Sequence, residues 1–212
     1  MSCNSGISSA KHPNCIEHDY IDFTGTFRCL SGNGEQPKIG NGKILSVVTT
    51  DERWVKGHQE FVLILSDPSN PGFAYGFGEV FKAKGMAIGV DKRLMVNLTF
   101  SKSNSEMIKP VVGGLVQSAP TVKSAGTIDY ANLKHPHQET CLGDYHELAV
   151  SHNVFAKQLV VNYYINTSDV LLDDNVTFIR GARVYIIGKI QDVSVLTGRI
   201  TVKVARIRVE AM

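Results

Sequence analysis

The sequence predicts an all-β protein, and three observations support this. Apolar residues fall in short runs rich in β-branched and aromatic side chains, separated by Gly, Asn, Asp and Pro. No segment sustains the 3.6-residue apolar period of an amphipathic helix. With 43% hydrophobic and 20% charged residues, the 212-residue chain has the composition of a globular protein and the length to bury a core.

Candidate strands follow in chain order, each bounded by turn residues. In the first half of the chain they cover residues 21–30, 43–50, 60–66, 78–84 and 94–101. In the second half they cover residues 159–165, 176–180, 182–191 and 199–210. Gly, Asn and Pro between the strands allow positive φ angles or fixed turns. Residues 145–155 are expected to hold at most a turn or two of helix.

The N-terminal residues 1–19 are rich in Ser, Asn and Gly, and we expect them to form a flexible tail. Residues 20–212 are expected to form a single β-rich domain. Residues 67–150 are expected to be an insertion or a second lobe, because residues 101–145 mix Gly, Pro, Ser and His with only brief apolar patches. No internal repeat is evident in the sequence.

The last candidate strand predicts a β-bulge near Ala205. Polar and apolar residues alternate from Arg199 to Val204, and the phase of the alternation reverses after Ala205. Side chains alternate strictly between the two faces of a strand, so a change of phase indicates an extra residue. Strongly bent strands of this kind turn the corners of small closed barrels.

Positive charge is concentrated near the C-terminus. Between Arg180 and Arg208 there are seven Lys or Arg residues and one acid, Asp192, whereas the whole protein has a formal charge of +2. The remainder of the chain is therefore net acidic. A local basic β-surface on a nearly neutral protein predicts a site for a polyanion.

Two segments resemble the single-stranded DNA-binding protein family. Arg180-Gly-Ala-Arg-Val-Tyr-Ile-Ile-Gly-Lys-Ile190, followed by Thr-Gly-Arg and a long strand, is similar to the closing strands of that family. Asn41-Gly-Lys43 and Thr50-Asp-Glu-Arg-Trp54 are similar to its Asn-Gly turn and its Ser-Glu-Arg-Trp segment. The family has the OB-fold. Because more residues separate these segments than in the family, the resemblance implies an OB-like barrel elaborated by a long insertion, with a β-sandwich or jelly roll as the alternative.

The resemblance implies largely sequence-independent binding of single-stranded DNA or RNA. On strand 182–191, basic and aromatic residues share one face, where cations would contact phosphates and tyrosine would stack on a base. The expected nucleic-acid-binding residues are Trp54, Arg180, Arg183, Tyr185, Lys189, Arg199 and Lys203. A solvated sheet face, with tyrosine beside aliphatic Lys and Arg stems, fits the same pattern. A lone tryptophan is also more often part of the core.

Other functions stay open at this point. A self-assembling structural protein, either capsid-like or an interaction module, fits the long strands and the N-terminal arm. An enzyme is less favoured, because the sequence contains none of the nucleophile, phosphate-binding or dinucleotide-binding motifs. Histidines and cysteines cluster in residues 12–18 and 135–146 without a recognised zinc spacing. We therefore expect neither a metal nor a cofactor.

The expected location is intracellular, without an indicated compartment. The first residues lack the apolar segment of a secretory signal, and no apolar run approaches the roughly 18 residues of a membrane span. Four widely spaced cysteines are then expected to be reduced thiols. A homo-oligomer is compatible with the sequence, and no membrane partner is expected.

Overall fold

The structure is a computed structural model of the chain. It describes residues 18–30, 43–49, 60–70, 77–90, 95–108, 119–134, 144–154, 157–170, 177–194 and 196–210. The expected flexible tail lies outside these residues except for its last two positions.

The described residues form ten β-strands and no helix. The strands are β1 (Tyr20–Arg28), β2 (Lys43–Thr49), β3 (Glu60–Ser66), β4 (Val80–Val90), β5 (Val96–Ile108), β6 (Thr121–Lys134), β7 (Tyr145–Val154), β8 (Lys157–Asn166), β9 (Arg183–Ser194) and β10 (Arg199–Val209). They belong to one sheet with the order β2-β3-β5-β4-β1-β6-β7-β8-β10-β9. The prediction of an all-β fold is confirmed.

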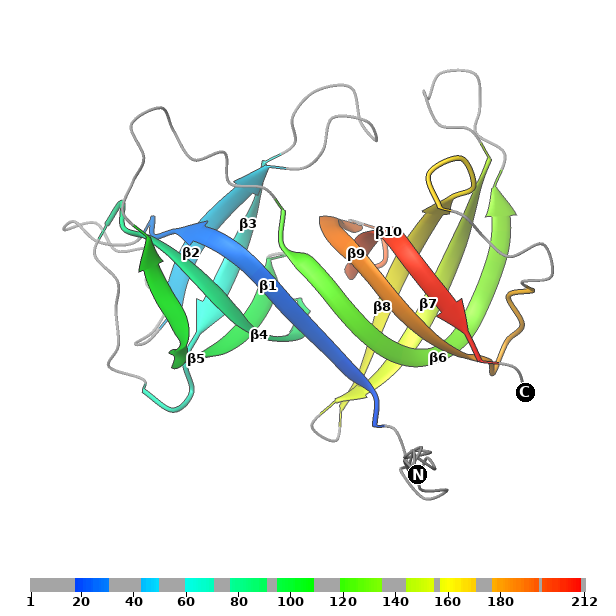
Figure 1. Cartoon of the computed structure of the whole chain (residues 1–212), viewed down its shortest axis with the longest axis horizontal. Coiled ribbons are helices and arrows are strands. Elements are labelled where there is room, and N and C mark those ends of the chain that lie inside the picture. The colour runs from blue at the N-terminus through cyan, green and yellow to red at the C-terminus, as the bar shows by residue number, and fades with distance from the viewer. Residues whose placement is uncertain are drawn as a thin grey trace, which may run out of the picture.

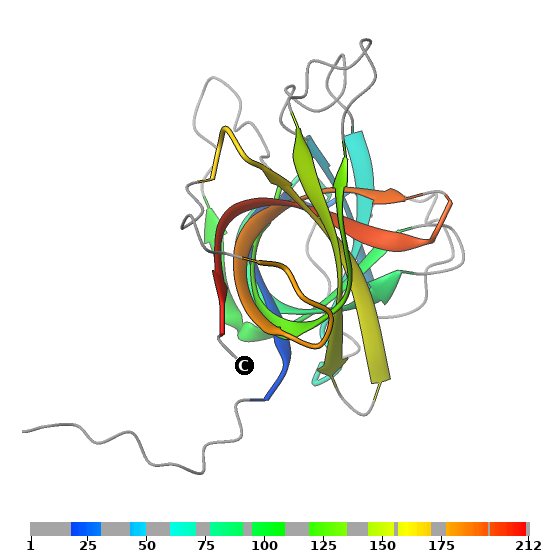
Figure 2. The same cartoon turned by 90° about the vertical axis from the view of Figure 1, so that its right-hand side faces the viewer.

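The second half of the chain closes into a five-stranded barrel (Figure 1). β7 pairs antiparallel with β6 and β8, β9 pairs antiparallel with β10, and β8 runs parallel to β10. An antiparallel ladder between β6 and β9 completes the ring, which Figure 2 shows from its end. This is the predicted OB-like barrel and not the alternative β-sandwich.

The first half of the chain repeats this connectivity. β2 pairs antiparallel with β3, β3 runs parallel to β5, and β4 pairs antiparallel with both β5 and β1. β1 also meets β2, since the backbone N–H of Arg28 donates to Ser46 Oγ at 3.2 Å. The chain therefore contains a structural repeat, β1 to β5 followed by β6 to β10, that is not evident in its sequence.

The first strands of the two halves join them into one sheet. β1 and β6 lie side by side and antiparallel, with Asp22 opposite Lys123 in the middle of the ladder (Figure 1). We call this ladder the seam. Because β6 also pairs with β9, a continuous outer face formed by β4, β1, β6, β9 and β10 crosses from one half to the other.

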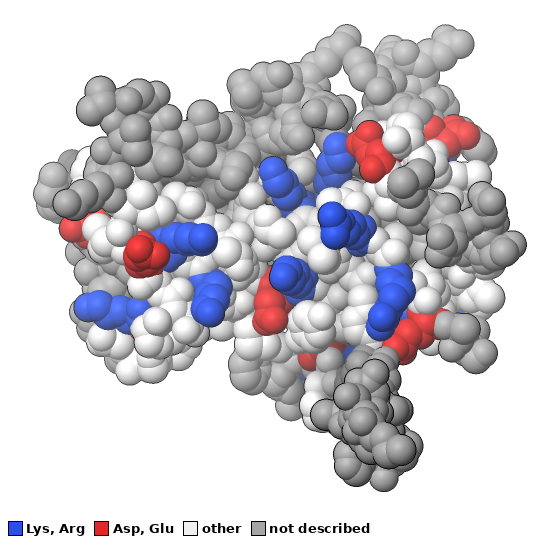
Figure 3. Space-filling view, viewed as in Figure 1, with Lys and Arg blue, Asp and Glu red and all other residues white. Residues whose placement is uncertain are grey.

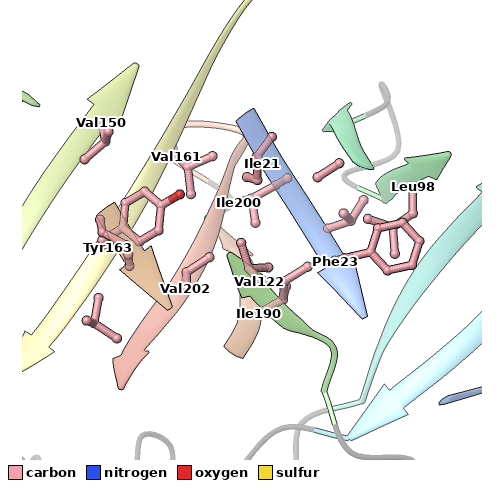
Figure 4. Packing of buried hydrophobic residues seen from close by; sticks show 14 of the residues in the cluster. Ile21, Phe23, Leu98, Val122, Val150, Val161, Tyr163, Ile190, Ile200 and Val202 are labelled. Carbon is pink, nitrogen blue, oxygen red and sulfur yellow. The ribbon is translucent and has the colours of Figure 1, made fainter. Parts of the chain in front are cut away.

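The core is one hydrophobic cluster that extends through both halves. In the first half, the Phe27 ring lies 5.8 Å from the rings of both Phe23 and Phe81, measured between centroids. In the second half, Tyr163 is fully buried near Val161 and Val150 (Figure 4). Large apolar side chains on the inner faces of the strands supply most of the burial that stabilises the fold.

A small polar network is buried within the second half. Tyr163 Oη lies 2.9 Å from both Ser124 Oγ and His152 Nε2, and His152 Nδ1 lies 2.8 Å from the backbone oxygen of Ala125. Burial lowers the pKa of His152, so the imidazole is neutral in the folded protein at neutral pH. The network links β6, β7 and β8 on the inside of the barrel.

Two strands, β6 and β7, are absent from the sequence-based prediction. β6 buries the small residues Ser124, Ala125 and Gly126 in place of a run of large apolar ones. A Cβ atom at Gly126 would stand 2.5 Å from the backbone oxygen of Ser151, so the neighbouring strand passes too closely for a larger side chain. β7 buries the polar residues Ser151 and His152, which hide its apolar pattern.

The structure also bears on the predicted strand at residues 176–180, the predicted bulge in the last strand and the predicted insertion at residues 67–150. The predicted strand at residues 176–180 is wrong, because residues 177–179 are not in a strand and Arg180 lies in a turn. The bulge near Ala205 is confirmed by a register shift between Val204 and Arg206. Residues 67–150 supply β4, β5, β6 and the start of β7, so they contribute to both halves, and the division of the chain into domains stays a prediction.

Candidate nucleic-acid interface

The outer face of β9 carries three of the residues expected to bind nucleic acid. Arg183, Tyr185 and Lys189 alternate with the buried residues Val184 and Ile186. Alternation along a strand places the first set on one face, toward solvent, and the second set in the core. The predicted two-sided strand is therefore confirmed from Arg183 to Lys189, whereas Gln191, which was expected on the same face as Lys189, is buried.

Arg183 is engaged within the protein. Its Nη1 lies 2.7 Å from Asp19 Oδ1, and 23% of the Arg183 side chain is exposed. The other carboxylate oxygen of Asp19 accepts hydrogen bonds from the backbone and side-chain amides of Asn153 at 3.0 and 3.1 Å. Asp19 thus ties the start of β1 to β9 and β7, and Arg183 is one part of that connection.

Tyr185 also has neighbours on its own face of the sheet. The guanidinium carbon of Arg208 lies 4.6 Å from the centroid of the Tyr185 ring, which is within the range of a cation–π contact. The Tyr185 hydroxyl donates to Glu210 Oε1 at 3.1 Å. One side of the ring is therefore covered by Arg208, which limits the ring surface available to a base.

Lys189 and Lys203 lie directly opposite each other in the β9–β10 ladder. Lys189 is exposed and makes no ion pair with any described residue. Lys203 is more enclosed, with 15% of its side chain exposed and its Nζ 3.0 Å from Asp169 Oδ2. Like charges directly opposite each other destabilise a sheet, and the Asp169 carboxylate offsets the charge of Lys203 in this pair.

The remaining expected residues are more scattered. Arg180 is exposed in the turn before β9, and Gly181 beside it has a φ of 89°. Arg199 begins β10, so it lies about 13 Å along the strand from Lys203. Trp54 lies outside the described residues. The structure thus brings Lys189 and Lys203 together and places Arg180 and Arg199 near opposite ends of the two strands.

A row of residues far apart in the sequence runs across the outer face. Following the paired positions from β4 to β10, it consists of Lys84, Thr24, Thr121, Lys189 and Lys203. The next row includes Asp22, Lys123, Ile187 and Arg206. Figure 3 shows Lys and Arg side chains distributed over both halves of this face. Strand register brings these residues together, and no local sequence pattern could have shown it.

A groove of about 610 Å³ lies over the seam. The described residues that line it include Asp22, Thr24, Lys84, Met86, Asn104, Thr121 and Lys123. Burial raises the pKa of Asp22, and the positive charge of Lys123 partly offsets this increase. Two smaller grooves share Asn104 with it and continue along β4 and β5. The seam is therefore hollowed as well as charged.

A second surface, on β7 and β8, carries aromatic side chains that sequence reasoning also missed. The Tyr145 and Tyr164 rings lie 5.5 Å apart at an angle of 66°. Burial and the nearby Glu147 carboxylate raise the pKa of Tyr164 to about 12, so its hydroxyl is protonated at neutral pH. β7 and β8 are the second and third strands of their barrel, which are the strands whose face binds oligonucleotides in OB-folds.

The His and Cys clusters from the sequence lie mostly outside the described residues. Of their members, His18 and His146 are described, and no group of metal-ligating side chains occurs in the part of the chain that the structure covers. The residues that the structure describes contain no helix long and apolar enough to cross a membrane.

Comparison with known proteins supports the fold and leaves the family open. No protein-family model matches the chain, and no curated protein matches it. Among solved structures, the chain is similar to the wild-type single-stranded DNA-binding protein of Thermus aquaticus, with a TM-score of 0.54 and 14% sequence identity. The match covers 92% of this chain and 93% of that one. The resemblance to the OB-fold of single-stranded DNA-binding proteins is thereby confirmed at the level of the fold.

Proposed function

We propose that the chain binds single-stranded nucleic acid, largely without regard to base sequence and without catalysing a reaction. The observation that carries this proposal is the lysine pair on the outer face of β9 and β10. Lys189 presents a charge without an ion-pair partner among the described residues, opposite Lys203. A positive surface on an OB-like barrel can follow a phosphate backbone whatever the base sequence.

The contacts inside the protein support a separate role for each expected residue. Lys189 and Lys203 are the central phosphate contacts, with Arg180, Arg199 and Trp54 as further contacts. Arg183 positions β9 through its ion pair with Asp19. The guanidinium groups of Arg208 and Arg183 lie 4.6 and 5.8 Å from the Tyr185 ring centroid, so a base can stack on Tyr185 only where these two side chains leave the ring exposed or after one of them moves.

The fold adds independent support for the proposal. The structural neighbour from Thermus aquaticus is described as a single-stranded DNA-binding protein. Aromatic rings that stack on bases contribute about 1–3 kcal/mol per base in such proteins. The Tyr145–Tyr164 pair offers rings of this kind on β7 and β8, on a different surface from Lys189. The experiment must therefore distinguish the two surfaces.

The test is a titration of the nuclease-treated protein against a labelled single strand. Fluorescence anisotropy with a mixed-sequence oligonucleotide of about 30 nucleotides, an upper size for two OB units, gives the affinity at several salt concentrations. Affinity should fall steeply with salt, and Lys189→Glu should weaken binding and lower the salt slope by about 0.7. Lys157→Glu, an exposed lysine on β8, makes the same change in net charge and should have little effect.

The outcomes separate the surfaces and the function. Absence of binding by the unchanged protein at low salt would contradict the proposed function. Loss of affinity in Tyr164→Ala, with no change in Lys189→Glu, would place the nucleic acid on β7 and β8. Competition with unlabelled RNA of the same length establishes which nucleic acid is preferred.

A further inference from the structure

We infer that the groove over the β1–β6 seam is a phosphate-binding site through which one single strand passes from the second half of the protein to the first. The inference rests on the proposed function, because it assigns a path to the same ligand. It goes further by naming a site on the first half, for which the sequence indicated no binding residue except Trp54.

The outer face aligns lysines of both halves in one row. Lys84 of β4 and Lys189 of β9 stand in the same row of paired residues, separated by Thr24 and Thr121. The row continues to Lys203 on β10. Five adjacent strands span about 19 Å at ~4.8 Å per spacing. A nucleic-acid strand that contacts Lys203 and Lys189 and continues in the same direction therefore reaches the hydroxyl groups of the two threonines and then Lys84.

The groove is lined by side chains whose chemistry suits a phosphate group. Lys84 and Lys123 are exposed, and Lys84 makes no ion pair with a described residue. Both lysines line the groove, together with Asn104 and the threonines of the row. Ammonium and hydroxyl groups donate hydrogen bonds to phosphate oxygens, and the amide of Asn104 can donate to a phosphate or bond a base edge. Met86 adds an apolar surface for a base or a sugar.

The charge of the outer face favours a polyanion over a second copy of the chain as its ligand. Besides the lysines of the row, the outer face exposes Lys82, Lys123 and Arg206. Glu106 of β5 lies opposite Lys82, and Asp169 pairs with Lys203, so Lys84, Lys189 and Arg206 carry most of the uncompensated charge. Asp22 is the acidic side chain in the groove, and its charge faces Lys123. Two such faces brought together would place like charges against each other, which opposes self-association. A phosphate backbone neutralises the same charges and releases counterions.

The experiment compares short and long probes. Oligothymidylates of about 8 and about 32 nucleotides correspond to one OB unit and to two. Lys84→Glu should lower affinity for the long probe roughly 5-fold at low salt and reduce its salt slope by about 0.7, with less than a 2-fold effect on the short probe. Lys84→Gln should show the same pattern to a smaller extent. Lys157→Glu serves as the control for net charge.

A second measurement locates the strand directly. Ultraviolet crosslinking of the long probe to the unchanged protein, followed by mass spectrometry, should identify peptides from β1 or β4 as well as from β9 or β10. The seam site would be overturned if crosslinks were confined to the second half and Lys84→Glu had the same affinity for the long probe as Lys157→Glu. The proposed function would survive that result if Lys189→Glu still weakened binding.

Two further outcomes would overturn the seam site in different ways. If neither probe binds the unchanged protein, the proposed function fails and the seam site fails with it. If Lys84→Glu leaves affinity unchanged but alters the sedimentation coefficient, the outer face is a contact between copies of the chain, and only the seam site is overturned.

Discussion

Gly188 of β9 lies against the backbone of Lys203 in β10, so closely that a Cβ atom at Gly188 would stand 2.3 Å from the Lys203 carbonyl oxygen. The first half has an equivalent approach, where a Cβ at Gly85 of β4 would stand 2.0 Å from the carbonyl oxygen of Thr99 in β5. Each half therefore has a glycine where the backbones of its fourth and fifth strands approach most closely. In the second half, this close approach lies beside the pair formed by Lys189 and Lys203, which stand opposite each other in the same ladder.

The close approach at Gly188 predicts a large cost for any side chain there. Gly188→Ala should lower the free energy of unfolding by about 3 kcal/mol, because the obstructing atom is in the backbone and cannot rotate away. Gly78→Ala is the matched control. Gly78 has a φ of 79° with open space around it, so alanine there should cost about 1 kcal/mol. Urea unfolding of both variants measures the difference, and equal costs would contradict the steric explanation.

The Lys189–Lys203 pair predicts opposite effects on stability and binding. Lys189→Glu replaces the positive charge that faces Lys203 with a negative one, beside the existing Lys203–Asp169 ion pair, so the free energy of unfolding should rise by at most about 0.5 kcal/mol. Affinity for single-stranded nucleic acid should fall in the same variant. Urea unfolding and anisotropy on one preparation measure the two quantities. A variant that loses stability and affinity together would show that Lys189 has a structural role.

The buried amide of Gln191 is a candidate for stabilisation. Neither its nitrogen nor its oxygen has a hydrogen-bond partner within the described structure, although the side chain is buried. Gln191→Met removes the unsatisfied groups at similar volume and should raise the free energy of unfolding by about 1 kcal/mol. Ser124→Ala is the contrasting variant. Because the Ser124 hydroxyl is hydrogen-bonded to the Tyr163 hydroxyl, Ser124→Ala should lower the free energy of unfolding by about 1 kcal/mol. A destabilised Gln191→Met protein would indicate an internal partner for the amide.

The His152 network predicts that stability falls in mild acid. Burial lowers the pKa of His152 in the folded protein, so below pH ~6.5 the unfolded chain binds a proton that the folded protein does not. The contribution of His152 to the free energy of unfolding is therefore fully present above pH ~6.5. It decreases as the pH falls, with a slope of up to about 1.4 kcal/mol per pH unit. Burial also lowers the pKa of His146, which adds a contribution of the same sign.

The measurement is the urea midpoint between pH 7.5 and pH 5, a range around the ordinary histidine pKa of about 6.5. His152→Gln should be less stable at pH 7.5 and should show a weaker pH dependence. His146→Gln should keep most of the dependence, because His146 is less buried. An unchanged slope in His152→Gln would exclude this histidine as its source.

The sequence by itself determined the strands whose pattern is local. The alternation in residues 182–191 predicted the two faces of β9 as far as Lys189, and the change of phase after Ala205 predicted the bulge in β10. These features follow from the two-residue period of a strand, which neighbouring residues alone establish. The positive charge of the last two strands was likewise visible, as was the partial resemblance that implied an OB-like barrel.

The tertiary structure decided everything that depends on pairing between distant strands. β6 shows no clear strand pattern, because the backbone of β7 passes close to Gly126. Small residues are therefore required where large apolar residues would have indicated a strand. The repeat of the barrel connectivity is carried by hydrogen-bonded ladders, which many different sequences can form. The row from Lys84 to Lys203 exists because β1 pairs with β6 in one register, and a shift by one residue would turn its side chains to the other face.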